Sequence, residues 1–176
     1  MAEDFSNNKN NWPTYIGTVA DYLVYNNKYV FSTNDSASAY NVFMPLTLDM
    51  QKDFSISLTS THTNGVQNAG YGIFFGASDV SNYYSFDISA NGYYRVSKST
   101  SAAYSDIIKW TTTPLVKTGD YVDNTLQVSK VGTNWIFGIN GQTVATVPAM
   151  AFMGNKLGFN EANIEQVQFD DVKVVQ

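Results

Sequence analysis

Cysteine is absent from this chain of 176 residues, and basic side chains are scarce. Without cysteine there is no disulfide framework, no thiolate metal site and no cysteine nucleophile. Arg95 is the only arginine and the formal net charge is −5, so the chain lacks the clustered cations that nucleic acid binding requires. His62 is the only histidine, which excludes zinc sites built from several histidines. We expect His62 to be a solvated imidazole in a loop.

Long apolar runs and charged residues are also in short supply. No run of 18 apolar residues occurs, so no membrane-spanning segment is expected, and the acidic start at Met1 is not followed by the apolar core of a secretory signal. Only 14% of residues are charged, against roughly 25% in typical soluble domains. The polar surface must therefore consist largely of Asn, Ser, Thr and Gln, which suits neutral ligands such as sugars. The chain is then either a cytosolic protein or a fragment of an exported or surface-attached bacterial protein, and the composition leads us to expect the second, with an extracellular or cell-surface location.

Apolar and polar residues alternate with a period of two along most of the chain, which predicts an all-β protein. Turn residues separate the alternating runs, and Asn140-Gly141 is typical of a type I′ hairpin. One open sheet rarely holds this many short strands without curling. We therefore expect two stacked antiparallel sheets in a single β-sandwich domain over residues 1–176. One helical turn is expected at Ser78–Asn82. The predicted strands are Tyr15–Val19, Lys28–Ser32, Asn41–Met44, Phe54–Ser60, Tyr71–Gly76, Tyr83–Ile88, Tyr93–Lys98, Ile107–Trp110, Thr125–Val131, Trp135–Ile139, Thr143–Val147, Lys156–Asn160 and Val167–Val175.

The hairpin predicted around Ala90-Asn91-Gly92 has aromatic residues on both faces, although a single buried face needs them on only one. Alternation assigns Tyr84, Phe86, Ile88, Tyr94 and Val96 to the core. The outer face then gathers Tyr83, Asp87, Tyr93 and Arg95, with Asn82 at the start of the strand. Asp87 and Arg95 are expected to pair across the two strands. By the same parity argument Trp110 and Trp135, which share a face with Ile108 and Phe137, are expected in the core.

Several motifs together resemble the concanavalin A-like lectin/glucanase superfamily. They are Gly70-Tyr-Gly-Ile-Phe-Phe-Gly76, Asn82–Ile88, Asn91–Val96, Phe137–Val144, and Leu157–Phe159 with Val167–Val174. The likeness is greatest to the laminin G-like and family-66-like carbohydrate-binding domains of bacterial surface proteins. It covers nearly the whole chain and implies a two-sheet antiparallel jelly-roll sandwich, a fold that hosts many functions.

The resemblance also implies candidate sites. Domains of this superfamily often hold a structural calcium ion near the chain ends, for which Asp4 and Asp171 are the candidate ligands. Laminarinase-like members are glycoside hydrolases whose carboxylates alternate on one strand as Glu-x-Asp-x-Glu. Here Glu161 and Glu165 flank Ala-Asn-Ile in an expected turn, with no Asp between them.

We therefore predict a non-catalytic module that binds a polysaccharide or other glycan. Tyr83 and Tyr93 are predicted to stack on sugar rings, while Arg95, Asp87 and Asn82 hydrogen-bond the hydroxyls. Two alternatives remain open. The first is a structural or protein-interaction domain that docks other domains of a larger protein, and the second is a glycoside hydrolase that uses Glu161 or Glu165.

Overall fold

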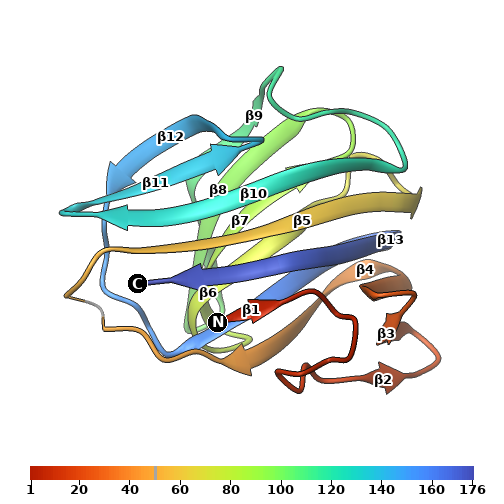
Figure 1. Ribbon diagram of the computed structural model, residues 1–176. Coiled ribbons are helices and arrows are strands. Elements are labelled where there is room, and N and C mark those ends of the chain that lie inside the picture. The colour runs from red at the N-terminus through yellow and green to blue at the C-terminus, as the bar shows by residue number, and fades with distance from the viewer. Residues whose placement is uncertain (50) are drawn as a thin grey trace.

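A computed structural model describes residues 1–49 and 51–176, and all regular secondary structure in these residues is β (Figure 1). The strands are β1 (Ala2–Glu3), β2 (Tyr15–Ile16), β3 (Ala20–Tyr25), β4 (Lys28–Pro45), β5 (Phe54–Gly65), β6 (Tyr71–Asp79), β7 (Asn82–Ser89), β8 (Tyr93–Thr100), β9 (Ala103–Thr112), β10 (Val122–Val131), β11 (Asn134–Ile139), β12 (Gln142–Pro148) and β13 (Lys156–Val175). The described residues contain no helix that could span a membrane.

The strands form two antiparallel layers that share β4 and β13 (Figure 1). In the front layer, residues 165–175 of β13 lie beside β5, which is followed by β10, β11 and β12. In the back layer, residues 156–161 of β13 lie beside β6, which is followed by β7, β8 and β9. Strand β4 follows β13 through both layers. The predicted all-β sandwich is therefore confirmed.

The passage of β13 from one layer to the other depends on a local irregularity. Its register to β4 shifts between Ala162 and Ile164, and the intervening Asn163 has a φ of 75°. Asn tolerates this left-handed conformation better than most residues, and such irregularities bend strands. The sequence predicted a pair of separate short strands in place of β4 and another pair in place of β13. Each of the two is instead one continuous strand that runs through the bend.

Three further differences concern the turns and the first strands. Ser78–Asn82 is not a helical turn, because β6 and β7 extend into it and form a hairpin there. Strand β3, which pairs with β4, and the short β1, which pairs with the end of β13, were not predicted. The type I′ prediction at Asn140-Gly141 is confirmed by φ values of 51° and 79°.

Aromatic side chains from both layers fill the space between them. Phe159 of β13 stacks on Trp12 on one side and on Phe169 on the other, with ring centroids 4.3 Å apart in both pairs. Near β6 and β11, Trp135 packs edge-on against Phe75 with centroids 5.2 Å apart. The stacked rings of Phe159 and Phe169 link the two halves of β13. The core therefore fixes the position of the back layer relative to the front layer.

Candidate functional site

The back layer presents a row of polar residues on its outer face, the face directed away from the core. Consecutive cross-strand partners in this row are Asn41, Asn160, Gly72, Asp87 and Arg95. Their sequence neighbours Val42, Phe159, Ile73, Phe86 and Val96 belong to the buried core cluster, as strand alternation requires. The side-chain oxygens Asn41 Oδ1, Asn160 Oδ1 and Asp87 Oδ1 are buried without a hydrogen-bond partner. Buried acceptors without a partner are uncommon in folded proteins.

Asp87 and Arg95 form the charged pair of this row. Arg95 donates from Nη2 and Nε to Asp87 Oδ2, at 2.9 and 3.3 Å, and Ser85 Oγ donates to the same oxygen at 3.0 Å. Asp87 is fully buried, whereas Arg95 is partly exposed. Burial of Arg95 opposes its charge, but the Asp87 carboxylate outweighs this effect and keeps the pKa of Arg95 above its ordinary value. The predicted pairing of Asp87 with Arg95 is confirmed.

Two aromatic rings from the edge strand β9 flank the Arg95 guanidinium. Its Cζ lies 4.6 Å from the ring centroid of Trp110 and 5.2 Å from that of Tyr104, both within the range of cation–π attraction. Trp110 also contacts the backbone at Gly70, where a Cβ atom would come within 2.9 Å of the indole. Arg95 and Gly70 therefore hold Trp110 in a defined orientation although it lies on an edge strand.

A cavity of about 180 Å³ adjoins Trp110 on this end of the outer face. The side chains lining it are Asn68, Ser89, Asn91, Tyr93 and Trp110. Tyr93 and Trp110 are 36% and 37% exposed, so both rings are open to a ligand. The loop before β6 is tied to the β7–β8 turn by a hydrogen bond from Asn91 N to Gln67 O at 3.0 Å, which fixes Asn68 opposite Ser89 and Asn91. Two aromatic faces and three uncharged polar side chains thus converge on one space.

The predicted site residues do not form one patch. Tyr93 lies opposite Ser89, whereas Tyr83 lies opposite Ser99 at the other end of the same strands. Tyr83 precedes Ser89 by six positions, which correspond to about 20 Å along the strand, too far for both tyrosines to hold one sugar ring. Tyr83 instead stacks on Phe74 with centroids 4.1 Å apart.

Asn82 has a role in the β6–β7 turn rather than beside Arg95. Its Nδ2 donates to both carboxylate oxygens of Asp79, at 3.0 and 3.2 Å, and its Oδ1 accepts from the backbone N–H of Ser101 at 2.9 Å. The structure therefore brings together Asp87, Arg95 and Tyr93, and it leaves Asn82 with Tyr83 at the opposite end of the hairpin.

Trp110 was predicted in the core, and this prediction is wrong, whereas Trp135 is fully buried as predicted. The register between β8 and β9 shifts twice, around Val96, so alternation does not carry over from Ile108 to Trp110. Asn68 was missed because it lies in a loop whose approach to the β7–β8 turn leaves no local pattern in the sequence.

The acidic residues predicted to bind calcium contact other groups. Asp4 Oδ1 accepts from Ser6 Oγ at 2.8 Å, and Asp171 is exposed at a bulge in β13 with a φ of 51°. Its neighbour Asp170 pairs with Lys28. Over residues 1–49 and 51–176 no group of three or more His, Asp or Glu side chains lies close enough together to hold a metal ion. The calcium site stays a prediction without support from the side chains.

Glu161, Glu165 and His62 form a buried cluster between the layers, so His62 is not the solvated loop residue that the sequence predicted. His62 Nδ1 lies 2.8 Å from Asp120 Oδ1, and His62 Nε2 lies 3.7 Å from Glu165 Oε2. Burial raises the pKa of Glu165 to about 8. Burial and the nearby Glu165 carboxyl also raise the pKa of Glu161 well above its ordinary value.

Glycoside hydrolysis requires a sugar between two carboxyl groups. Glu161 and Glu165 are 0% and 3% exposed. A polysaccharide therefore has no access to them in this conformation.

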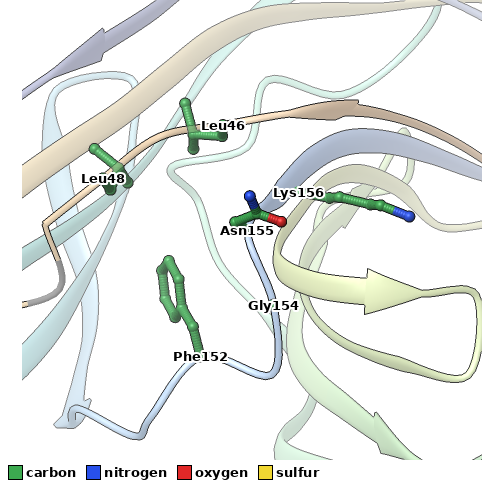
Figure 2. A pocket seen from close by; sticks show the side chains of 6 residues that line it. All are labelled: Leu46, Leu48, Phe152, Gly154, Asn155 and Lys156. Carbon is green, nitrogen blue, oxygen red and sulfur yellow. The ribbon is translucent and has the colours of Figure 1, made fainter.

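Cavities elsewhere are less suited to a sugar. The one in Figure 2 measures about 50 Å³ and lies between Leu46, Leu48 and Phe152, with the Lys156 side chain directed away from it. A larger depression of about 640 Å³ has Phe152 as its single aromatic side chain, and that ring packs against the core residues Phe54 and Phe75. Neither combines open aromatic faces with converging polar groups.

No family model and no curated protein matches the sequence. Among solved structures, the carbohydrate-binding module CBM66 from Bacillus subtilis matches 94% of this chain over 91% of its own length, with a TM-score of 0.61 and 14% identity. Sheep galectin-11 matches 77% of this chain over 96% of its own length, with a TM-score of 0.54 and 8% identity. This chain has the concanavalin A-like fold. A Bacillus subtilis protein of unknown function with a galectin-like fold agrees with this assignment, with a TM-score of 0.65 and 14% identity over 100% of this chain and 94% of its own.

The concanavalin A-like fold confirms the jelly-roll prediction. The likeness concerns the arrangement of strands, and this sandwich supports many functions. The function must therefore be argued from the outer face of the back layer.

Proposed function

We propose that this concanavalin A-like domain is a non-catalytic carbohydrate-binding module whose ligand occupies the cavity beside Tyr93 and Trp110. The observation that carries the proposal is the convergence of two open aromatic faces and three uncharged polar side chains on that cavity. Aromatic faces pack against the apolar side of a sugar ring, and amide and hydroxyl groups bond its hydroxyls. On this proposal Tyr93 and Trp110 contact the ring, while Asn68, Ser89 and Asn91 select its hydroxyl groups.

The size of the cavity favours one sugar residue at a time. Its volume of about 180 Å³ is below the roughly 300–1,000 Å³ typical of pockets for drug-sized ligands. A terminal sugar or a single residue of a polysaccharide fits this volume better than a long buried chain. Arg95 and Asp87 support binding indirectly. Asp87 holds Arg95, and Arg95 orients the Trp110 indole through the cation–π contact.

Two broader features support the proposal. Solved structures with the same fold include a protein named as a carbohydrate-binding module and a galectin. The low charged fraction of 14% fits an exported or surface-attached protein in which this module serves other domains of a longer chain. We propose that location together with the function.

Binding to a panel of soluble polysaccharides and arrayed glycans tests the proposal, with affinities then measured by calorimetry. Trp110→Ala and Tyr93→Ala should each weaken the binding at least tenfold, which corresponds to about 1.4 kcal/mol or more. Tyr25→Ala is the matched control, because this exposed tyrosine lies at the end of β3 in the front layer. Absence of binding to every glycan, or equal affinities in all three variants, would overturn the proposal.

A further inference from the structure

We infer that the cavity beside Tyr93 and Trp110 selects neutral glycans and rejects anionic ones, and that Asp87 sets this preference. The inference rests on the proposed function, because it assigns a ligand class to the same cavity. Sialylated and uronate-containing sugars carry a carboxylate that must find a cation or a cluster of donors near neutral pH. The charges around the cavity decide whether this site offers one.

The lining itself carries no charge. Asn68, Ser89, Asn91, Tyr93 and Trp110 are neutral at physiological pH, and none of them can form an ion pair with a ligand carboxylate. A neutral sugar gains hydrogen bonds and ring contacts from these groups without the cost of removing a charge from water. An anionic sugar would bring its charge into the same space with no partner there, which is unfavourable.

Arg95 lies against the Trp110 ring of this lining, and two carboxylates act on it. Asp87 accepts two hydrogen bonds from it, at 2.9 and 3.3 Å, and Asp106 acts on it electrostatically. Tyr104, whose ring faces Arg95, donates to Asp106 Oδ1 at 3.0 Å and so holds that carboxylate in the group. Arg95, Asp87 and Asp106 together carry a formal net charge of −1, so the arginine is already neutralised and offers no free positive charge to an incoming anion.

Asp87 controls this balance because it is fixed and buried. Three donated hydrogen bonds converge on its Oδ2, and the side chain has no exposed surface with which to contact a ligand. Its role is to neutralise Arg95, not to bind sugar hydroxyls as the sequence had predicted. The Coulomb interaction between such buried or half-buried charges is only weakly screened by salt.

Matched pairs of glycans that differ only in a carboxylate test the inference, for example galactose-terminated chains with and without sialic acid and glucans against glucuronate-containing chains. The wild-type protein should bind the neutral member of a pair at least tenfold more tightly. Asp87→Asn should lower this neutral-to-acidic ratio at least fivefold, because Arg95 loses the negative charge that neutralises it. Asp106→Asn should lower it at least twofold, and this exposed position keeps the test valid if Asp87→Asn does not fold.

Asp53→Asn is the control for net charge, since it changes the charge by the same amount at an exposed side chain directly before β5 of the front layer. It should leave the ratio unchanged. Equal or tighter binding of the acidic members, or a ratio that stays constant in both site variants, overturns the inference and leaves the proposed function standing. Absence of binding to either member of every pair overturns both.

Discussion

Glu165→Gln should reduce a loss of stability that the wild-type protein shows as the pH rises from about 5 to 8. Glu165 lies in the buried cluster with His62 and Glu161, and burial raises its pKa to about 8 from the ordinary 4.5. The hydrogen bond from Ala162 N to Glu165 Oε1, at 3.2 Å, opposes this effect but does not cancel it. The folded protein therefore holds a proton on Glu165 at pH values where the unfolded chain has lost it.

The direction and the size of the effect follow from proton linkage. Below pH 4.5 Glu165 is protonated in both states and its contribution is fully present, whereas between 4.5 and about 8 unfolding releases a proton and stability falls as the pH rises. A pKa difference of about 3.5, at about 1.4 kcal/mol for each pH unit, sets an upper limit of roughly 5 kcal/mol. For a domain of this size that corresponds to a decrease in Tm of roughly 10 to 20 °C.

The raised pKa of Glu161 acts in the same direction. Hydrogen bonds lower the pKa of Asp4, Asp35 and Asp79, so their contribution is lost only as the pH falls towards 4 and below. The maximum of stability is therefore expected near pH 5.

Thermal unfolding of the wild-type protein and of Glu165→Gln at pH 5, 6.5 and 8 measures this effect. Glutamine keeps the size of the side chain and an oxygen that accepts from Ala162 N, but it does not ionise. The two proteins should be about equally stable at pH 5, and the variant should be the more stable at pH 8. Asp53→Asn, at an exposed side chain, controls for the change in net charge. A wild-type Tm that is flat or rises from pH 5 to 8, or parallel curves for the two proteins, would refute the reasoning.

Two further predictions concern packing and are measured by urea unfolding at pH 5. Phe159→Ala should lower the free energy of unfolding by about 3–5 kcal/mol, because the ring is stacked between two other aromatic rings in the core. Gly158→Ala should lower the free energy of unfolding by about 1–3 kcal/mol or more, because the added Cβ would lie 1.9 Å from Val42 O. Gly138→Ala is the control, because a Cβ there would meet its nearest atom at 3.5 Å. A loss below 1 kcal/mol at Phe159, or equal losses at the two glycines, would contradict this packing.

The β7–β8 hairpin was predictable because it obeys local rules. The two strands pair in regular register from Tyr83 to Tyr93, so alternation assigns every side chain to the correct face. Asp87 and Arg95 consequently meet as the sequence predicted, at 2.9 Å. Regular register over a whole hairpin makes the assignment of side chains to faces dependable. It predicted Asp87, Tyr93 and Arg95 on the outer face, where the structure has them.

Trp110 and Asn68 were not predictable on the same grounds. A β-bulge adds a residue to one strand without requiring a distinctive residue type, so the shifts between β8 and β9 leave no mark in the sequence pattern. Asn68 reaches the site through a loop contact whose partner lies more than twenty residues away along the chain. Both residues depend on tertiary contacts rather than on periodicity.

The buried acids were misassigned for a related reason. Glu161 and Glu165 flank a sequence that reads as a turn, yet β13 continues through it with a single distortion at Asn163. His62 is covered because the segment before β10 folds over it. Asp120 Oδ1 lies 2.8 Å from His62 Nδ1, and the Tyr121 N–H donates to the His62 backbone oxygen at 2.7 Å. Burial by a distant segment is invisible to a local pattern.

The buried acids and the proposed sugar site share this same segment, which affects how binding should be measured. Asp120 Oδ1 contacts both His62 and Gln67, at 2.8 and 3.2 Å, and the Gln67 backbone oxygen accepts from the Asn91 N–H beside the cavity. The Gly119 N–H also donates to the β7–β8 turn, at Ala90 O. The loops that shape the cavity are therefore anchored to the cluster that loses stability as the pH rises. Glycan affinities measured near pH 5 report on the cavity with that anchor intact, whereas values at pH 8 combine binding with the cost of ionising the cluster.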